Sequence, residues 1–424
     1  MRFGVSGSNG SAWQKFQAAF GTHIGAPQLG KPPIITRPSV TRIKETTDFG
    51  TNPGHLRMFT YVPGSLADSP GLVVVLHGCG QTAAGYDHGA GWSSLADRYG
   101  FALLMPQQQP SNNQNTCFNW FLPEDTQRGR GEAASIKQMI DTMTRETGVD
   151  PSHVFVAGLS AGGAMTSAML ACYPDMFAAG AIVAGLPFGA ASNLQQALQS
   201  MYQSPPRLPR EWGDAVRAAG PRVDVTWPRV SVWHGATDKT VIPSNAREIL
   251  KQWTDVHGLP QSPTKQMTVD GHPRQVWLND RGEEAVEFYN IAGMGHGTPL
   301  ATGDADSECG TAGPFLLDVG ISSTFHIATF FGLTARKAHP RPVIDVQETI
   351  DTTVAEAPLA NGTVIAPPMA SRSTPQIMAP QIMTPRIIEQ EIEDNEGPAQ
   401  PRYPTRIDIG AVITKALTAA GLMK

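Results

Sequence analysis

The segment VFVAGLSAGGAMTSAMLAC, residues 154–172, carries the strongest structural signal in this chain. Its first residues, Val154–Ala157, form a short apolar run of the kind found in strands that are buried on both faces. Its last residues, 163–172, have the composition of a helix. Between them stands the pentapeptide Gly-Leu-Ser-Ala-Gly, residues 158–162. The segment therefore predicts a strand, a sharp turn and a helix in direct succession.

Similar strand and helix patterns lie on both sides of this segment. The apolar runs typical of buried strands are Gly71–Leu76, Phe101–Met105, Val154–Ala157, Ala179–Val183 and Val230–Trp233, and Arg57–Val62 is a further strand candidate with alternating side chains. The helical patterns are Trp92–Tyr99, Glu132–Thr147, Gly163–Cys172 and Asn245–His257. Strands that alternate with helices predict an α/β fold with a mainly parallel sheet flanked by helices.

The 424 residues exceed the length over which one hydrophobic core usually grows, so we expect one large domain with extensions. Four parts are predicted. They are an irregular N-terminal extension over 1–45 with a short helix at Trp13–Phe20, a folded domain over 46–335, a Pro-rich disordered linker over 336–406, and an amphipathic helix within 407–424 that runs from Asp408 to Ala420. We expect the last helix to dock on its own domain or on another subunit, which would make a homo-oligomer, and the alternative is that it binds a surface.

Charge and hydropathy exclude some classes of partner. The formal net charge is −5 and no segment concentrates basic residues, which argues against nucleic acid. No run of 18 apolar residues predicts a transmembrane segment. Residues 1–30 lack the unbroken apolar stretch of a signal peptide, so we expect a cytoplasmic protein.

The four cysteines are Cys79, Cys117, Cys172 and Cys309. They are few and widely spaced, and no Cys-x-x-Cys pair suggests zinc. We interpret them as mostly packed thiols. A bridge between Cys79 and Cys117 stays open as the alternative, since both flank the site described next.

The strand, turn and helix at 154–172 form the pattern of a nucleophile elbow. Gly158 and Gly162 leave room for a strained turn that presents the hydroxyl of Ser160, and the N-terminus of the helix favours the negative charge that develops during attack. We therefore predict that Ser160 is a nucleophile. The alternative is a structural serine in a tight turn.

A serine nucleophile needs a base and an acid, and in the fold that has a nucleophile elbow these follow the serine along the chain in the order acid, then histidine. Asp238 lies in the loop after the strand that ends at Gly235, and His296 lies in the glycine-rich sequence GMGHG. We predict that Asp238 is the acid and His296 the base. Weaker substitutes for the acid are Asp224 and Asp255, and we expect His234 to pack locally.

The oxyanion of a tetrahedral intermediate needs two backbone donors. Ala161, directly after the serine, supplies the first, and Cys79 in the glycine turn after Leu76 is our choice for the second, with Gly78 as the alternative. The aromatic loop Cys117–Phe121 either caps the core or lines a substrate cleft. Trp120 and its neighbour Asn119 are the substrate-binding candidates.

Several motifs together resemble the esterase family of poly(3-hydroxybutyrate) depolymerases, within the α/β-hydrolase superfamily. The resemblance covers residues 50–333 and rests on LHGCGQTAAGYD, NWF, RGRGEAASI, GLSAGGAM, WHGATDKTV, GMGHG and CGTAGPFLLDVGISSTFHIATFFGL. It implies an α/β-hydrolase fold, with Ser160 as nucleophile, Asp238 as acid, His296 as base and Cys79 as an oxyanion residue. No metal or cofactor is expected.

The resemblance also bears on substrate and location. It implies a serine esterase that hydrolyses hydroxyalkanoate esters, such as oligo- or poly-3-hydroxybutyrate, through an acyl-enzyme intermediate. Feruloyl and acetyl-xylan esterases are relatives, so a feruloyl- or acetyl-type carboxylesterase is the alternative activity. A catalytically silent protein that binds polyester granules is the alternative from a different class. Many relatives are secreted, which makes an extracellular location the alternative to a cytoplasmic one.

Overall fold

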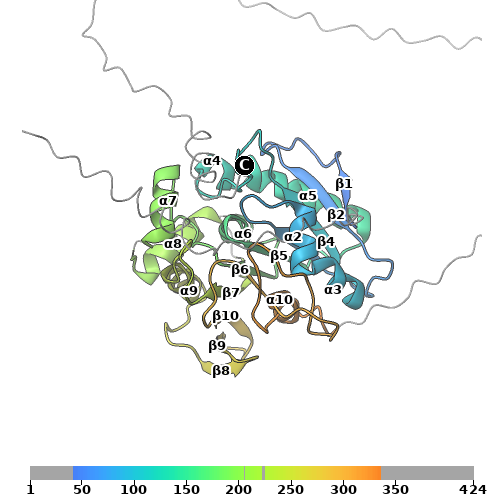
Figure 1. Cartoon of the computed structure of the whole chain (residues 1–424). Coiled ribbons are helices and arrows are strands. Elements are labelled where there is room, and N and C mark those ends of the chain that lie inside the picture. The colour runs from blue at the N-terminus through green and yellow to red at the C-terminus, as the bar shows by residue number, and fades with distance from the viewer. Residues whose placement is uncertain (1–41, 205, 222–224, 336–424) are drawn as a thin grey trace, which may run out of the picture. The chain divides into compact units, whose positions relative to one another are not determined.

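A computed structural model describes residues 42–204, 206–221 and 225–335. Within these residues a ten-stranded sheet has the strand order β1-β2-β4-β3-β5-β6-β7-β10-β9-β8 (Figure 1). In chain order the strands are β1 (Lys44–Thr46), β2 (Arg57–Tyr61), β3 (Leu72–Leu76), β4 (Ala102–Gln107), β5 (Val154–Leu159), β6 (Ala179–Val183), β7 (Arg229–Gly235), β8 (Lys265–Val269), β9 (His272–Leu278) and β10 (Glu284–Ile291). The strands from β4 through β3, β5, β6 and β7 to β10 are parallel. The strands beyond them at both edges pair antiparallel.

Helices cover both faces of the sheet. They are α2 (Ala83–Ala90), α3 (Trp92–Tyr99), α4 (Pro123–Thr126), α5 (Gly131–Thr147), α6 (Ala161–Cys172), α7 (Leu194–Tyr202), α8 (Pro209–Ala219), α9 (Ser244–Val256) and α10 (Ser323–Phe330). One core cluster joins Val74 of β3 to side chains of α5, α6, α8 and α9. A second cluster joins Val73 of the same strand to α2, α3 and α10. Because β3 is buried on both faces, its sequence shows no polar alternation.

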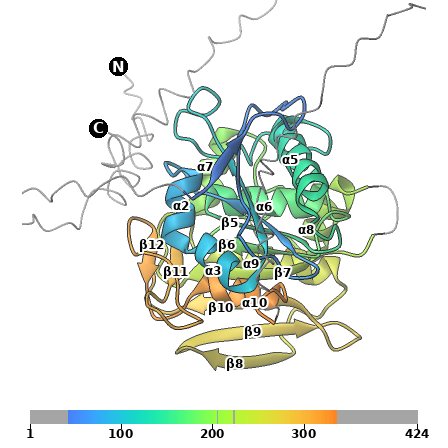
Figure 2. The ribbon, with the colours of Figure 1, turned by 90° about the vertical axis from the view of Figure 1, so that its right-hand side faces the viewer.

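The fold predicted from the sequence is confirmed: a mainly parallel sheet flanked by helices. All six predicted strands and four predicted helices form, and α3 and β6 have the predicted bounds. Helices α2, α7, α8 and α10 and the strands β8 to β10 were not predicted, and β8 and β9 form the hairpin at the lower edge of Figure 2. A small separate sheet pairs β11 (Thr298–Leu300) with β12 (Leu316–Asp318).

Some predictions concern residues that the structure does not describe. The expected helix at 13–20, the linker over 336–406 and the helix at 408–420 lie outside the described residues. The division of the chain into four parts therefore stays a prediction. Strand β1 begins at Lys44, within the segment assigned to the N-terminal extension, and pairs with β2. In the described part of the chain, no helix combines the length and the apolar character needed to cross a membrane.

Candidate active site

Ser160 lies at the turn between β5 and α6, in the middle of the sheet. Its backbone angles are φ 58° and ψ −115°, a conformation that non-glycine residues rarely adopt. The flanking glycines make this turn possible. A Cβ atom on Gly158 would lie 2.3 Å from the carbonyl oxygen of Gly162, and one on Gly162 would lie 2.2 Å from that of Leu76. The two glycines therefore let α6 approach β5 and β3 closely enough to form the turn.

His296 joins Ser160 to Asp238. Its Nε2 lies 2.9 Å from the Oγ atom of Ser160, and its Nδ1 lies 2.7 Å from Oδ2 of Asp238. Because an ionised carboxylate only accepts hydrogen bonds, Nδ1 carries the proton and Nε2 is free to accept from the serine hydroxyl. The structure thus brings together the three residues that the sequence predicted as nucleophile, base and acid.

Asp238 is held as an anion. Its Oδ1 accepts hydrogen bonds from the backbone N–H groups of Thr240 (2.8 Å) and Val241 (2.9 Å). Burial opposes ionisation of this carboxyl, but the hydrogen bond and charge of His296, the charge of His234 and the hydrogen bond from Val241 together outweigh it, and the pKa of Asp238 lies below its ordinary value. The carboxylate is therefore present to orient the imidazole and to stabilise it when it becomes protonated.

The loops that carry Asp238 and His296 are joined by hydrogen bonds. The N–H of Ala236 donates to the carbonyl oxygen of Ile291 (2.9 Å), and that of Thr237 donates to Met294 (2.9 Å). A Cβ atom on Gly235 would lie 2.3 Å from the carbonyl oxygen of Gly295. These contacts follow from the parallel pairing of β7 with β10, because the carboxyl ends of both strands lie at the same edge of the sheet.

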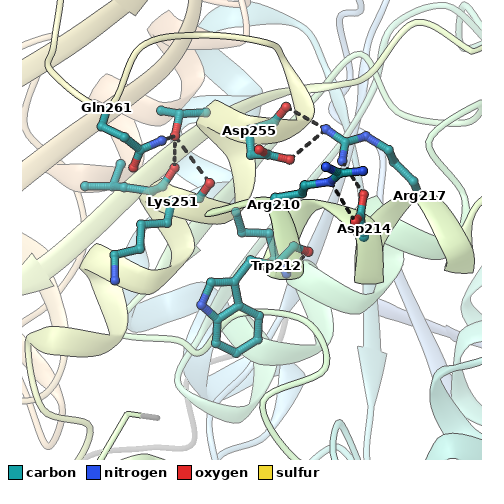
Figure 3. Close-up of polar contacts among 10 residues, drawn as sticks. Arg210, Trp212, Asp214, Arg217, Lys251, Asp255 and Gln261 are labelled. Carbon is teal, nitrogen blue, oxygen red and sulfur yellow. Dashed lines mark hydrogen bonds and ion pairs between the residues drawn. The ribbon is translucent and has the colours of Figure 1, made fainter. Parts of the chain in front are cut away.

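Of the alternatives to Asp238 and His296, Asp255 and His234 lie in the described part of the chain, and each has a hydrogen-bond partner of its own. Asp255 accepts a hydrogen bond from the guanidinium of Arg217 at 2.7 Å, in the contact between α8 and α9 (Figure 3). Asp224 lies outside the described residues. The ring of His234 is buried and its Nε2 donates to the carbonyl oxygen of Val241 at 2.7 Å, which is the local packing expected from the sequence.

The candidate oxyanion donors lie in the loop after β3, which carries Cys79, and at the first residue of α6, which is Ala161. Among the described residues, no acceptor is found for the N–H groups of Cys79 and Ala161. The N–H of Gly78, the alternative to Cys79, donates instead to the side-chain oxygen of Gln81 at 2.9 Å. This bond favours Cys79 over Gly78 as the second donor.

Cys79 and Cys117 form a disulfide. The interpretation of the cysteines as mostly packed thiols is therefore wrong for this pair, and the bridge left open as the alternative is present. The two loops are brought together by a hydrogen bond from the N–H of Gly80 to the carbonyl oxygen of Asn115 (2.8 Å). Cys172 and Cys309 are buried free thiols, as expected.

The two substrate-binding candidates in the aromatic loop, Trp120 and Asn119, differ in their surroundings. Trp120 is half-buried and meets the ring of Phe121 edge-on at 5.5 Å. It also packs against the cluster that contains Ala164, at the start of α6. Asn119 is buried, and its side-chain oxygen accepts a hydrogen bond from Asn113 at 2.9 Å. Trp120 therefore stays a candidate for substrate contact, whereas the side chain of Asn119 helps to hold the loop in place.

Two residues near the site were missed by sequence reasoning. The ring of Phe315 meets that of His296 edge-on, with centroids 5.9 Å apart, and its φ of 62° is unusual for a bulky residue. No sequence signal distinguishes Phe315 from a core aromatic. His77 is buried next to Cys79 and bonds the backbone of that loop. The position of His77 directly before Gly78, in the turn that carries Cys79, could have identified it from the sequence.

Comparisons with known proteins show similarity to esterases. A family profile described as esterase PHB depolymerase matches residues 57–268. Poly(3-hydroxyalkanoate) depolymerase C of Paucimonas lemoignei is 45% identical over 299 residues, which cover 70% of this chain and 72% of that protein. Acetylxylan esterase of Coprinopsis cinerea is 38% identical over 61% of this chain and 70% of its own. The solved structure of an acetyl xylan esterase from Aspergillus awamori is similar with a TM-score of 0.59 and 26% identity, over 69% of this chain and 99% of that one.

Proposed function

This chain belongs to the esterase PHB depolymerase family and is a carboxylic ester hydrolase, and on that premise we propose that it cleaves hydroxyalkanoate esters with Ser160 as nucleophile, His296 as base and Asp238 as acid. The observation that carries the proposal is the position of His296. Its two ring nitrogens lie within hydrogen-bonding distance of Ser160 and of Asp238. This arrangement is the one that acyl transfer by a serine requires.

The proposed reaction has two steps. In the first, the Oγ atom of Ser160 attacks the ester carbonyl carbon while Nε2 of His296 takes the hydroxyl proton. The N–H groups of Cys79 and Ala161 stabilise the negative oxygen of the tetrahedral intermediate. The intermediate collapses by breaking the bond to the alcohol oxygen. The alcohol leaves with the proton from His296, and the acyl group stays on Ser160 as an ester.

In the second step water replaces the alcohol. His296 takes a proton from a water molecule, whose oxygen attacks the acyl carbon. Collapse of this second intermediate breaks the bond to Ser160, which regains its proton from His296, and the free carboxylic acid leaves. Asp238 keeps its charge throughout, and it stabilises the protonated imidazole that forms in each step.

The substrate class is proposed from the most informative relative. The depolymerase from Paucimonas lemoignei matches most of the described chain at 45% identity. This similarity favours oligomers or polymers of 3-hydroxyalkanoates. The half-buried Trp120 offers an apolar surface next to the start of α6 for an aliphatic acyl chain.

A second candidate is an esterase that acts on acetylated or feruloylated carbohydrate. It is favoured by the 38% identity to an acetylxylan esterase and by the similarity to a solved acetyl xylan esterase. Both candidates share one mechanism and differ only in the acyl and alcohol groups that the site accepts.

A hydrolysis panel separates the candidates. We would compare kcat/KM for 3-hydroxybutyrate oligomers, acetylated xylan, methyl ferulate and p-nitrophenyl esters of increasing chain length. The proposal expects the hydroxybutyrate oligomers to give the highest value. A higher value for acetylated xylan or methyl ferulate would move the assignment to the second candidate. Labelling by a fluorophosphonate probe tests for a reactive serine, and a folded protein that resists labelling would be the silent granule-binding protein.

A further inference from the structure

A buried histidine supports the loop that carries Cys79. His77 directly follows β3 and is 1% exposed. Its Nδ1 lies 2.8 Å from the carbonyl oxygen of Gly78, and its Nε2 lies 3.1 Å from the N–H of Gln108. A carbonyl oxygen only accepts and a backbone N–H only donates, so these two partners decide the tautomer. The ring is neutral, with its proton on Nδ1.

The hydrogen bond from Nδ1 of His77 restrains the N–H group of Cys79, to which His77 is not itself bonded. The carbonyl oxygen of Gly78 and the N–H of Cys79 belong to one planar peptide group, so fixing one end of the group fixes the direction of the other. Neighbouring groups hold the loop on both sides of this peptide. The N–H of Gly78 donates to Gln81, and the N–H of Gly80 donates to Asn115.

Gln108 connects His77 to the other half of the disulfide. Its backbone N–H donates to His77, while its side-chain Nε2 donates to the carbonyl oxygen of Cys117 at 3.0 Å. The same Nε2 donates to the carboxyl group of Glu132 at 2.6 Å, and that carboxyl also accepts from the N–H of Asn119 at 2.9 Å. Glu132 is fully buried. Gln108 thus holds both loops that the Cys79–Cys117 bridge joins.

We infer that His77 is a positioning residue for the oxyanion hole, because its Nδ1–H fixes the peptide between Gly78 and Cys79 and so aims the N–H of Cys79 at the developing oxyanion. The inference rests on the proposed function, since it assigns His77 to the site of Ser160. Burial lowers the pKa of His77 to about 4, which keeps the ring neutral near pH 7 and its Nε2 able to accept from Gln108.

Three substitutions separate the two ring nitrogens. The amide nitrogen of His77→Asn replaces Nδ1 as donor to Gly78. The amide oxygen of His77→Gln replaces Nε2 as acceptor from Gln108, and His77→Leu replaces neither nitrogen. We expect His77→Leu and His77→Gln to lower kcat by about 10²-fold, near the lower end of what loss of one oxyanion donor costs, with KM within about threefold. His77→Asn should stay within about tenfold of the wild-type kcat, because it keeps the bond to Gly78.

A transition-state analogue gives a second readout. A trifluoromethyl ketone adds to a serine hydroxyl and forms an oxyanion, so its inhibition constant should rise across the three variants in proportion to the loss of kcat/KM. Loss of a merely structural contact would lower the melting temperature without this proportionality. His257→Leu is the matched control, because His257 donates to the carbonyl oxygen of Pro228 at 3.0 Å outside the site. That variant should melt at a lower temperature and keep kcat within about twofold of the wild type, because the substitution lies away from the active site.

Two results would overturn the inference. One is a folded His77→Leu variant whose kcat stays within tenfold of the wild type. The other is an equal loss of kcat in His77→Asn and His77→Leu. Ser160→Ala is assayed in parallel, because retained activity in that variant would contradict the proposed nucleophile, whereas the His77 series tests only the oxyanion loop.

Discussion

At the scale of single residues, Ser160 decides whether the proposed chemistry occurs. We expect Ser160→Ala to lower ester turnover by about 10³-fold or more, because no other group in the site can form the acyl-enzyme. Steady-state hydrolysis of a p-nitrophenyl ester measures this loss. A variant that keeps a tenth of the wild-type rate would show that the nucleophile is assigned wrongly.

The backbone conformation of Ser160 provides a control for this variant. Alanine keeps the Cβ atom and therefore the strain at φ 58°, whereas glycine adopts this conformation freely. Ser160→Gly should be as inactive as Ser160→Ala but melt at a higher temperature. Equal melting temperatures would indicate that the turn stores no strain.

Asp238 is tested by removing its charge without changing its shape. Asp238→Asn should lower kcat by up to about 10⁴-fold, because the amide favours the wrong tautomer of His296. Asp255→Asn is the matched control, since Asp255 bonds Arg217 at 2.7 Å between α8 and α9. We expect that control to change kcat by less than about threefold, as a surface substitution away from the site does. A larger loss in the control than in Asp238→Asn would overturn the acid assignment.

At the scale of elements, the close packing of α6 against β3 holds the turn in place. Gly162→Ala would bring a Cβ atom to 2.2 Å from the carbonyl oxygen of Leu76, so the helix must move. We expect a loss of about 1–3 kcal/mol in the free energy of unfolding, together with lower kcat. Gly64→Ala is the control, because a Cβ atom there meets nothing within 4 Å. Denaturant unfolding of both variants measures the difference, and equal stabilities would contradict the packing argument.

The central strands could be predicted because they are buried on both faces, which leaves continuous apolar runs such as that of β3. Strand β10 was missed although it belongs to the parallel part of the sheet. Its run is interrupted by Glu287, a buried carboxyl that accepts hydrogen bonds from Ser231 and Arg274. Strand β8 is exposed over most of its length, so its sequence carries no apolar signal.

The candidate site was predictable to a similar extent. Ser160, Asp238 and His296 could be proposed because each stands in a glycine-containing turn whose position relative to a strand is legible in the sequence. The contacts that hold those turns in place could not be predicted from the sequence. The pairing of β7 with β10 and the contact of Phe315 with His296 join segments that are distant along the chain, and no local pattern records them.

At the scale of the whole molecule, the disulfide bears on where the protein acts. A cytoplasmic location was expected from the sequence and stays a prediction, whereas disulfides persist mainly in oxidising compartments. The bridge between Cys79 and Cys117 therefore favours the extracellular alternative. Protein isolated in the presence of an alkylating agent should show two free thiols out of the four cysteines. Four free thiols would place it in a reducing compartment.

The residues of the proposed site all lie between His77 and His296, and the sheet and helices that position them end at Phe330. Strand β10 and the loop after it supply the last of these residues, and α10 closes the core beneath them. We therefore expect removal of the residues after Lys337 to leave kcat/KM for small soluble esters within about twofold of the full chain, because no described contact of the site would be lost. Comparing both proteins by ester hydrolysis, melting temperature and light scattering separates catalysis from docking. A lower melting temperature or a changed oligomeric state, at unchanged turnover, would place the terminal segment on its own domain or on another subunit. Loss of turnover in a truncated protein that still folds would show that the tail completes the active site.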